Sequence, residues 1–306
     1  MPLAFLAVLL PTLFWDHPAD TADALRKAGI ERIYAPAGSE AAWAQRGVTA
    51  KPFDRGRAVE AVAPHVEYQM DVASATRVPW VDANGWRFER EPARTYYYKV
   101  PAGSAALAAA EAWTYGVEAA IHAAPEDLDS FGRMTKFLAE NDRPRLPVMA
   151  NLGVIDDGSD TIAEVLNLLA RHNLLFHVIP APDPKYDLNI KLGTAEYPQD
   201  QAADPYAFAI EMRHRLTDEK RLVRIYGSNV VLVRLTGDGA QARLYLLNYG
   251  KAVVKGLRVR VLGTFAEGKL AAFAHPGALA DFAAADGATE FSIPEIGPLA
   301  VVDLRH

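Results

Sequence analysis

The stretch Gly256-Leu257-Arg258-Val259-Arg260-Val261-Leu262 decides the fold of the C-terminal part of the chain. Its apolar and charged residues alternate, so one face of an extended strand would be buried and the other would meet water. This alternation is typical of an antiparallel sheet. Similar short strands are predicted around it, at 230–235, 242–248, 290–293 and 300–304. Because no helical pattern separates them, the sequence predicts an antiparallel β-sandwich domain at 227–306.

Upstream of Gly227, strand patterns alternate with helical ones, which predicts an α/β domain at 1–226. Eight strands are candidates, ending near Trp15, Ala35, Phe53, Val100, His122, Ile155, Ile179 and Leu192. Eight parallel strands with intervening helices would form a TIM-barrel-like domain, which the short helices could leave incomplete. The alternative is an open, doubly wound sheet of about five strands.

Two local patterns make specific predictions within this domain. Strand 147–155 is followed by the loop Asp156-Asp157-Gly158-Ser159-Asp160 and by a helix, for which Thr161 and Glu164 form a predicted capping box. Asn173 would end this helix. Farther upstream, Asn84-Gly85 lies among aromatic residues and predicts a small hairpin or a functional loop.

Composition excludes several classes of protein. The 306-residue chain carries 32 Lys and Arg against 38 Asp and Glu, a net charge of −6, so a nucleic-acid partner is not expected. The chain has no cysteine, which excludes disulfides, thiolate metal sites and cysteine nucleophiles. The histidines lack metal-ligand spacing, and no nucleotide-binding motif occurs, so no metal and no cofactor are expected.

The N-terminal stretch at 2–10, PLAFLAVLL, has two interpretations. It resembles the hydrophobic region of an export signal, although no basic residue precedes it and no small-residue cleavage site follows. It could instead be a buried first strand running into Trp15. The first interpretation predicts a periplasmic or extracellular protein. No segment reaches the length that spans a membrane.

The C-terminal strands carry a resemblance to a known class of enzymes. The stretches Leu244-Tyr245-Leu246-Leu247-Asn248-Tyr249 and Thr289-Glu290-Phe291-Ser292-Ile293-Pro294 look like the C-terminal sandwiches of bacterial glycoside hydrolases, which follow a barrel-like domain. The β-α-β unit at 147–179 resembles the amidotransferase-like domain of some β-galactosidases. The resemblance implies a carbohydrate partner. One departure is that no Asn-Glu acid/base pair follows a strand, since Glu140-Asn141 is reversed and ends a helix.

Glycoside hydrolysis needs two carboxyl groups, which a barrel would hold at the carboxyl ends of its strands. Asp156 and Asp16 follow predicted strands and are the candidate catalytic residues. The structural alternatives are a turn at Asp156-Asp157-Gly158 and a helix-entry loop at Asp16. The candidate substrate-binding residues, which would stack on sugar rings or bind hydroxyl groups, are Trp15, Trp80, Asn84, Trp86, Arg87 and Tyr97.

Two functions therefore remain open. The first is a glycoside hydrolase-like protein that acts on a polysaccharide or oligosaccharide through an aspartate pair. The second is a non-catalytic carbohydrate-binding or scaffolding relative with the same fold. The aromatic residues of segment 80–98 could form a sugar-stacking platform, and the alternative for them is a hydrophobic lid over an incomplete sheet. The sequence does not determine the oligomeric state.

Overall fold

A computed structural model describes residues 10–67 and 79–306 of the chain. These residues form two compact units. Unit 1 contains the described residues up to His65 together with Asp82–Pro144, and unit 2 contains the described residues of 66–81 together with Arg145–His306. The short strands β5 (His65–Glu67) and β6 (Trp80–Asp82) lie where the chain passes from one unit to the other. Each unit is described separately below.

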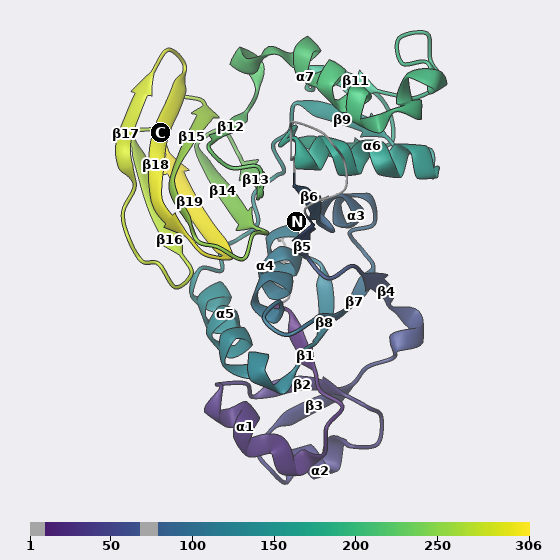
Figure 1. The fold of residues 1–306 in the computed structure, drawn as a ribbon, viewed down its shortest axis with the longest axis vertical. Helices are drawn as coiled ribbons and strands as arrows, with labels where there is room; N and C mark the ends of the chain where they lie inside the picture. The colour runs from purple at the N-terminus through teal and green to yellow at the C-terminus, as the bar shows by residue number, and fades with distance from the viewer. Residues whose placement is uncertain (1–9, 68–78) are drawn as a thin grey trace, which may run out of the picture. The chain divides into compact units, whose positions relative to one another are not determined.

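Unit 1 is built on a six-stranded sheet in the order β3-β2-β1-β8-β7-β4, in which every neighbouring pair is parallel. Figure 1 labels its strands, which are β1 (Thr12–Phe14), β2 (Arg32–Ala35), β3 (Thr49–Pro52), β4 (Val59–Ala61), β7 (Thr95–Lys99) and β8 (Glu118–His122). Strands that follow one another in the chain are neighbours, and the last strand pairs with the first. Only β3 and β4 are consecutive strands of the sheet that do not pair.

Short and medium helices connect these strands. They are α1 (Ala22–Lys27), α2 (Glu40–Ala44), α3 (Gly85–Arg90), α4 (Ala105–Tyr115) and α5 (Leu128–Glu140), with single 3₁₀ turns at Ala19–Thr21, Arg55–Arg57 and Pro125–Asp127. Helix α4 is buried along nearly its whole length, which explains its run of alanines, because only small side chains allow such close packing. Gly29, after the last turn of α1, has φ of 75°, the left-handed conformation that a helix end favours in glycine.

The two faces of the six-stranded sheet differ. One face is apolar and fully buried, and it comprises Leu13, Ile33, Ala35, Tyr96, Tyr98, Ala119 and Ile121. The opposite face is mostly polar, and it comprises Thr12, Arg32, Tyr34, Lys51, Glu60, Thr95, Lys99, Glu118 and His122, with Phe14, Tyr97 and Ala120 as a small buried cluster. A doubly wound sheet would be apolar on both faces, because helices cover both. This sheet has one covered, apolar face and one mostly polar face, so it does not match that pattern.

The predicted strands are confirmed, but the predicted closed barrel is not found in residues 10–67 and 79–306. Five of the eight candidates lie in the sheet of unit 1, with β4 as a sixth strand that the sequence did not reveal. The other three, β9 (Leu152–Ile155), β10 (Phe176–Ile179) and β11 (Leu188–Ile190), form a separate parallel sheet in unit 2. The reason is that β8 pairs with β1, so β1 has a neighbour on each side and the sheet of unit 1 is complete before the chain reaches β9.

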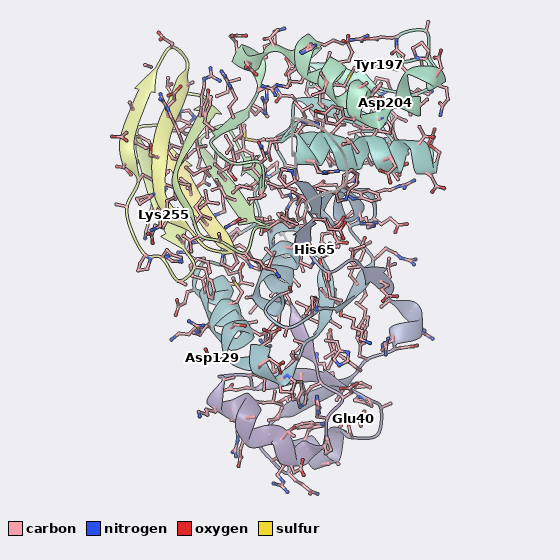
Figure 2. All side chains as sticks on the ribbon, in the orientation of Figure 1. Glu40, His65, Asp129, Tyr197, Asp204 and Lys255 are labelled. Carbon is pink, nitrogen blue, oxygen red and sulfur yellow. The ribbon has the colours of Figure 1, made fainter. Side chains whose placement is uncertain are left out.

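The α/β layer of unit 2 has strand order β10-β9-β11 and two long helices, α6 (Asp160–Arg171) and α7 (Pro205–Lys220), with a 3₁₀ turn at Gln199–Ala203. The predicted capping box at Thr161 is wrong. Ser159 caps α6, since its hydroxyl oxygen accepts a hydrogen bond of 3.2 Å from the Ile162 N–H. Asp204, labelled in Figure 2, caps α7 by accepting from the Ala207 N–H. Asn173 has φ of 53°, as expected of a residue that ends a helix.

The C-terminal part of unit 2 is a sandwich of two four-stranded antiparallel sheets, β12-β15-β18-β17 and β13-β14-β19-β16. The strands are β12 (Val223–Tyr226), β13 (Val231–Gly237), β14 (Gln241–Asn248), β15 (Val254–Leu262), β16 (Glu267–Ala272), β17 (Ala280–Ala285), β18 (Ala288–Ile296) and β19 (Leu299–Arg305). In β15, Leu257, Val259 and Val261 are buried while Arg258 is exposed, which confirms the predicted alternation. The first sandwich strand begins at Val223, four residues before the expected Gly227.

Two buried or half-buried asparagines join the α/β layer to the sandwich within unit 2. The Asn173 side chain donates to the Val231 carbonyl and accepts from the Val233 N–H. The Asn151 amide donates to the Lys220 carbonyl and accepts from the Leu222 N–H. Asn173 thus links the end of α6 to β13, and Asn151 links the residue before β9 to the segment between α7 and β12. These bonds help to make the layer and the sandwich one compact unit.

The hairpin predicted at Asn84-Gly85 is wrong, because α3 begins at Gly85. A Cβ atom on Gly85 would overlap the Tyr115 hydroxyl group, so glycine is needed here for the close approach of α3 to α4. Of the N-terminal stretch 2–10, only Leu10 belongs to the described residues, so export stays a prediction. No helix in the described part of the chain is both long and apolar enough to cross a bilayer.

Candidate functional site

Three side chains towards the carboxyl end of the six-stranded sheet of unit 1 lie in a row, joined by one hydrogen bond and one close polar contact. The Tyr97 hydroxyl lies 2.8 Å from Nδ1 of His122, and Nε2 of His122 lies 3.3 Å from Oδ1 of Asp16. They come from the adjacent strands β7 and β8 and from the segment after β1. Functional groups of α/β folds collect at this end of a sheet, because the loops after parallel strands meet there.

His122 lies between Tyr97 and Asp16. Its Nδ1 is hydrogen-bonded to the Tyr97 hydroxyl, and the tautomer of the ring decides which of the two groups donates. Its Nε2 faces the Asp16 carboxylate, which is exposed on its other side.

Aromatic rings line the polar face beside this row of side chains. Phe14 contacts Tyr97 edge-on, with ring centroids 5.7 Å apart, and Phe53 lies 6.1 Å from Tyr97 in a stacked arrangement. Phe53 follows β3, so this contact reaches across three intervening strands and shows that the sheet is strongly curved. The Arg55 guanidinium lies over the Tyr97 ring at 4.4 Å.

Glu60 provides a second carboxyl group next to Tyr97. It lies on β4 directly opposite Tyr97 in the register, so both side chains leave the sheet on the polar face. The pKa of Tyr97 is raised mainly by burial, and the negative charges of Asp16 and Glu60 raise it further, against the lowering effect of Arg55. Both carboxyl groups therefore act on the same hydroxyl group from different strands.

A third carboxyl group of the polar face, that of Glu118, has a structural role at the opposite end of the sheet. It accepts hydrogen bonds of 2.7 Å from the Tyr34 hydroxyl and 3.0 Å from the Thr95 hydroxyl. Burial, and then this bond to Glu118, raises the pKa of Tyr34 above its ordinary value. Glu118 stands at the first position of β8, away from the carboxyl ends of the strands.

The remaining candidates of unit 1 lie inside its packing. Trp15 is 1% exposed on the helix-covered face, and its indole N–H donates to the Thr21 hydroxyl. Asn84 is fully buried, with its side-chain oxygen on the Val62 N–H and its amide on the Val62 carbonyl and Glu111. Trp86 is 7% exposed, and the Arg87 guanidinium lies over its ring at 4.3 Å.

Two candidates belong to unit 2. Asp156 follows β9, as the sequence predicted, and its carboxylate accepts a hydrogen bond of 2.9 Å from the Gly158 N–H within the turn. The Arg171 guanidinium lies over the Trp80 ring, 3.4 Å from the ring centroid. Asp156 and Asp16 thus belong to different compact units, and no single site of either unit contains both.

Glu60 and His122 are the site residues that sequence reasoning missed. His122 ends a predicted strand, as Asp16 does, and the same criterion could have selected it. Glu60 gave no such signal, because the three-residue strand β4 has no recognisable period in the sequence. As a potential metal site within unit 1, Nε2 of His65 lies 3.4 Å from Oδ2 of Asp82, which places two suitable ligands side by side.

No protein-family model and no curated protein matches the chain. Among solved structures, the chain is similar to α-L-fucosidase isoenzyme 2 from Paenibacillus thiaminolyticus, with a TM-score of 0.50 and 8% identity over 70% of this chain and 61% of that chain. It is also similar to a rhamnosidase from Novosphingobium sp., with a TM-score of 0.46 and 11% identity over 94% of this chain and 38% of that chain.

A β-galactosidase from Rahnella sp. matches with a TM-score of 0.37 and 10% identity over 96% of this chain and 60% of that chain. All three similar proteins act on glycosides by name, and this chain spans less than two thirds of the length of each. At these identities the likeness concerns the fold alone, and it says nothing of individual residues.

Proposed function

We propose that the protein binds a polysaccharide or oligosaccharide at the carboxyl end of the sheet of unit 1 and hydrolyses it through Asp16 and Glu60. The observation that carries this proposal is the placement of these two carboxyl groups, which both act on the Tyr97 hydroxyl from different strands. Glycoside hydrolysis requires two carboxyl groups facing one bond. Asp156 is not part of the proposed pair, because it belongs to the other unit.

The surroundings of the pair support a sugar ligand. Phe53 is half-buried beside Tyr97, and aromatic faces suit the C–H faces of sugar rings. Arg55 and Lys99 are exposed donors on the same side of the sheet. His122 lies 3.3 Å from the Asp16 carboxylate, and this neighbour would favour one orientation of the carboxylate towards a substrate.

The test is turnover on a panel of aryl glycosides. Asp16→Asn and Glu60→Gln should each lower kcat by about 100-fold or more, which is the usual contribution of a carboxyl group in acid/base catalysis. The matched control is Asp129→Asn, because Asp129 is an exposed carboxylate on α5 that pairs only with Arg133 in the described contacts. Its turnover should equal that of the wild type.

A non-catalytic carbohydrate-binding protein is the second candidate, and one observation favours it. Asp16 already lies against His122 at 3.3 Å, and such a pair can serve to bind sugar hydroxyl groups without catalysis. This alternative predicts no turnover on any glycoside but saturable oligosaccharide binding that Asp16→Ala weakens. A wild type that neither turns over nor binds any member of the panel would rule out both functions.

A further inference from the structure

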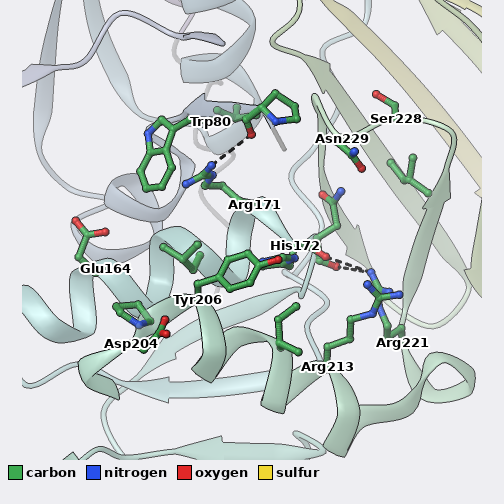
Figure 3. A pocket seen from close by; sticks show the side chains of 17 residues that line it. Trp80, Glu164, Arg171, His172, Asp204, Tyr206, Arg213, Arg221, Ser228 and Asn229 are labelled. Carbon is green, nitrogen blue, oxygen red and sulfur yellow. Dashed lines mark hydrogen bonds between the residues drawn. The ribbon is translucent and has the colours of Figure 1, made fainter. Parts of the chain in front are cut away.

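Unit 2 contains a cavity of about 540 Å³ that the proposed function does not use. It lies between α6, the first half of α7 and the segment from β12 to β13, and Figure 3 shows its lining. Its size is within the range of pockets that hold small organic molecules, roughly 300 to 1,000 Å³. Charged side chains line its walls, and their arrangement determines which ligands could bind there.

Positive charge dominates one end of the cavity. Arg213 and Arg221 lie together in Figure 3, well apart from Glu164 and Asp204 at the other end. The Asp204 carboxylate already accepts a hydrogen bond in capping α7. The basic end would therefore attract an anion, and the two carboxylates at the other end are too far from it to repel that anion strongly.

One carboxylate serves several guanidinium groups at the basic end. Asp218 lies 3.3 Å from Arg221, 3.7 Å from Arg213 and 3.1 Å from Arg224. Arg224 also interacts with Glu219, whereas Arg213 and Arg221, which line the cavity, share Asp218, and this leaves an excess of positive charge at this end. Guanidinium groups suit oxyanions, because their planar fork matches carboxylate and phosphate oxygens.

Arg221 is built into this wall and still has a donor to offer. Its side chain is 8% exposed, and two of its nitrogens bond to Asp218 and to the His172 carbonyl. Its Nε–H is buried and has no hydrogen-bond partner among the described residues. Burying an N–H without a partner is unfavourable, so the Arg221 guanidinium is less than fully paired in the wall of the cavity.

His172 and Tyr206 form the middle of the wall. Burial lowers the pKa of His172 to about 4, and the charges of Arg171, Arg213 and Arg221 act in the same direction. The imidazole is therefore neutral at pH 7 and offers one donor and one acceptor. Tyr206 packs on it with ring centroids 5.2 Å apart, although the tyrosine is 49% exposed. An exposed aromatic ring at a cavity mouth suits the carbon skeleton of a ligand.

We propose that this cavity binds a small polar molecule that carries an oxyanion, a phosphate or a carboxylate group on a sugar-sized skeleton, with Arg213 and Arg221 on the anion and Tyr206 on the skeleton. This binding site lies in unit 2 and is separate from the site of Asp16 and Glu60. It gives the protein a second ligand, whether or not the first site hydrolyses glycosides.

The experiment is calorimetric titration of the full chain with inorganic phosphate, a hexose phosphate, a hexuronate and a neutral hexose. Saturable binding of the hexose phosphate or the hexuronate is expected, with the neutral hexose at least tenfold weaker. The anionic hexose that binds more tightly identifies the oxyanion. If inorganic phosphate binds as tightly as the hexose phosphate, the skeleton contributes nothing to binding, which contradicts the proposed role of Tyr206.

Variants locate the site. Arg213→Gln should weaken binding about tenfold or more, since a charge-assisted contact is lost. Arg213 is a suitable target because it is 44% exposed, so the variant should fold. The matched control is Arg215→Gln on the same helix, which pairs with Glu211 and Glu196, does not line the cavity, and should leave binding unchanged. Equal binding of neutral and anionic hexoses, or equal loss in both variants, would overturn the proposal.

Asp16→Asn separates this proposal from the function of unit 1. That variant should bind the anionic ligand as the wild type does, because Asp16 belongs to the other compact unit. Binding of the hexose phosphate that Asp16→Asn abolishes and Arg213→Gln leaves intact would place the anion at the carboxyl end of the sheet of unit 1, against the proposal.

Discussion

Replacing Glu111 by alanine should destabilise unit 1 by several kcal/mol. Glu111 is fully buried in α4, and three donors converge on its carboxylate. The backbone N–H of Asn84 lies 2.7 Å from Oε1, while the Asn84 amide at 2.9 Å and the Tyr98 hydroxyl at 2.7 Å both bond to Oε2. The network fixes the start of α3 against β7 and α4.

The magnitude follows from the groups that the substitution leaves behind. The Asn84 N–H and the Tyr98 hydroxyl would lose the Glu111 carboxylate as acceptor, and each such buried donor costs about 1–3 kcal/mol. The Asn84 amide keeps its bond to the Val62 carbonyl and adds little. With the small cavity included, we expect Glu111→Ala to lower the free energy of unfolding by about 3–5 kcal/mol.

The assay is equilibrium unfolding in guanidinium chloride, followed by circular dichroism. Because the two units can unfold separately, hydrogen exchange of the α4 amides assigns the transition to unit 1. A double-mutant cycle with Tyr98→Phe should give a coupling energy of about 1–2 kcal/mol, since both side chains belong to one network. Glu140→Ala, on the exposed side of α5, is the control and should change stability by less than about 0.5 kcal/mol.

A loss below about 1 kcal/mol for Glu111→Ala, or a coupling energy of zero with Tyr98, would refute the reasoning. Burial and the bond to Glu111 hold the pKa of Tyr98 well above its ordinary value. The tyrosine hydroxyl therefore stays protonated around neutral pH, and the measured coupling should not vary between pH 6 and pH 8.

Three further predictions follow from single contacts. Ser159→Ala should lower stability by about 1 kcal/mol, whereas Ser104→Ala should be nearly neutral because Ser104 makes no side-chain capping bond; chemical denaturation of both variants measures the difference. Gly132→Ala should cost about 3 kcal/mol or more, because its Cβ would overlap the Ala28 carbonyl oxygen, whereas Gly277→Ala meets no atom; equal melting temperatures would contradict this. His172 has a folded pKa of about 4, below its unfolded value, so the unfolded state binds more protons between pH 6.5 and pH 4 and stability should fall as pH falls through that window; His172→Gln should flatten the decline, which for a half-buried group amounts to about 1–2 kcal/mol.

The candidate site was only partly predictable, for reasons that its residues make clear. Asp16 could be selected because it follows a strand whose apolar period is clear. Its partners His122 and Tyr97 come from strands more than 80 residues farther along the chain, and nothing local pairs them. The rings of Trp15 and Trp86 suggested stacking on a ligand, but an aromatic residue has the same sequence signature whether it is packed in a core or open to a sugar.

Strand and helix identities depend on local periodicity, and here the sequence by itself determined most of them, with β4 and α3 as exceptions. It located the eight upstream strands and the alternation in β15, and it showed that the segment after Gly227 is an antiparallel sandwich. Tertiary structure alone decided which strands pair. Parallel pairing depends on crossovers of many residues, and its free energy depends on the surface that each sheet buries, which no short window reveals. Thus β8 returned to β1, β9 began a second sheet, and Asp156 and Asp16 were placed in separate units.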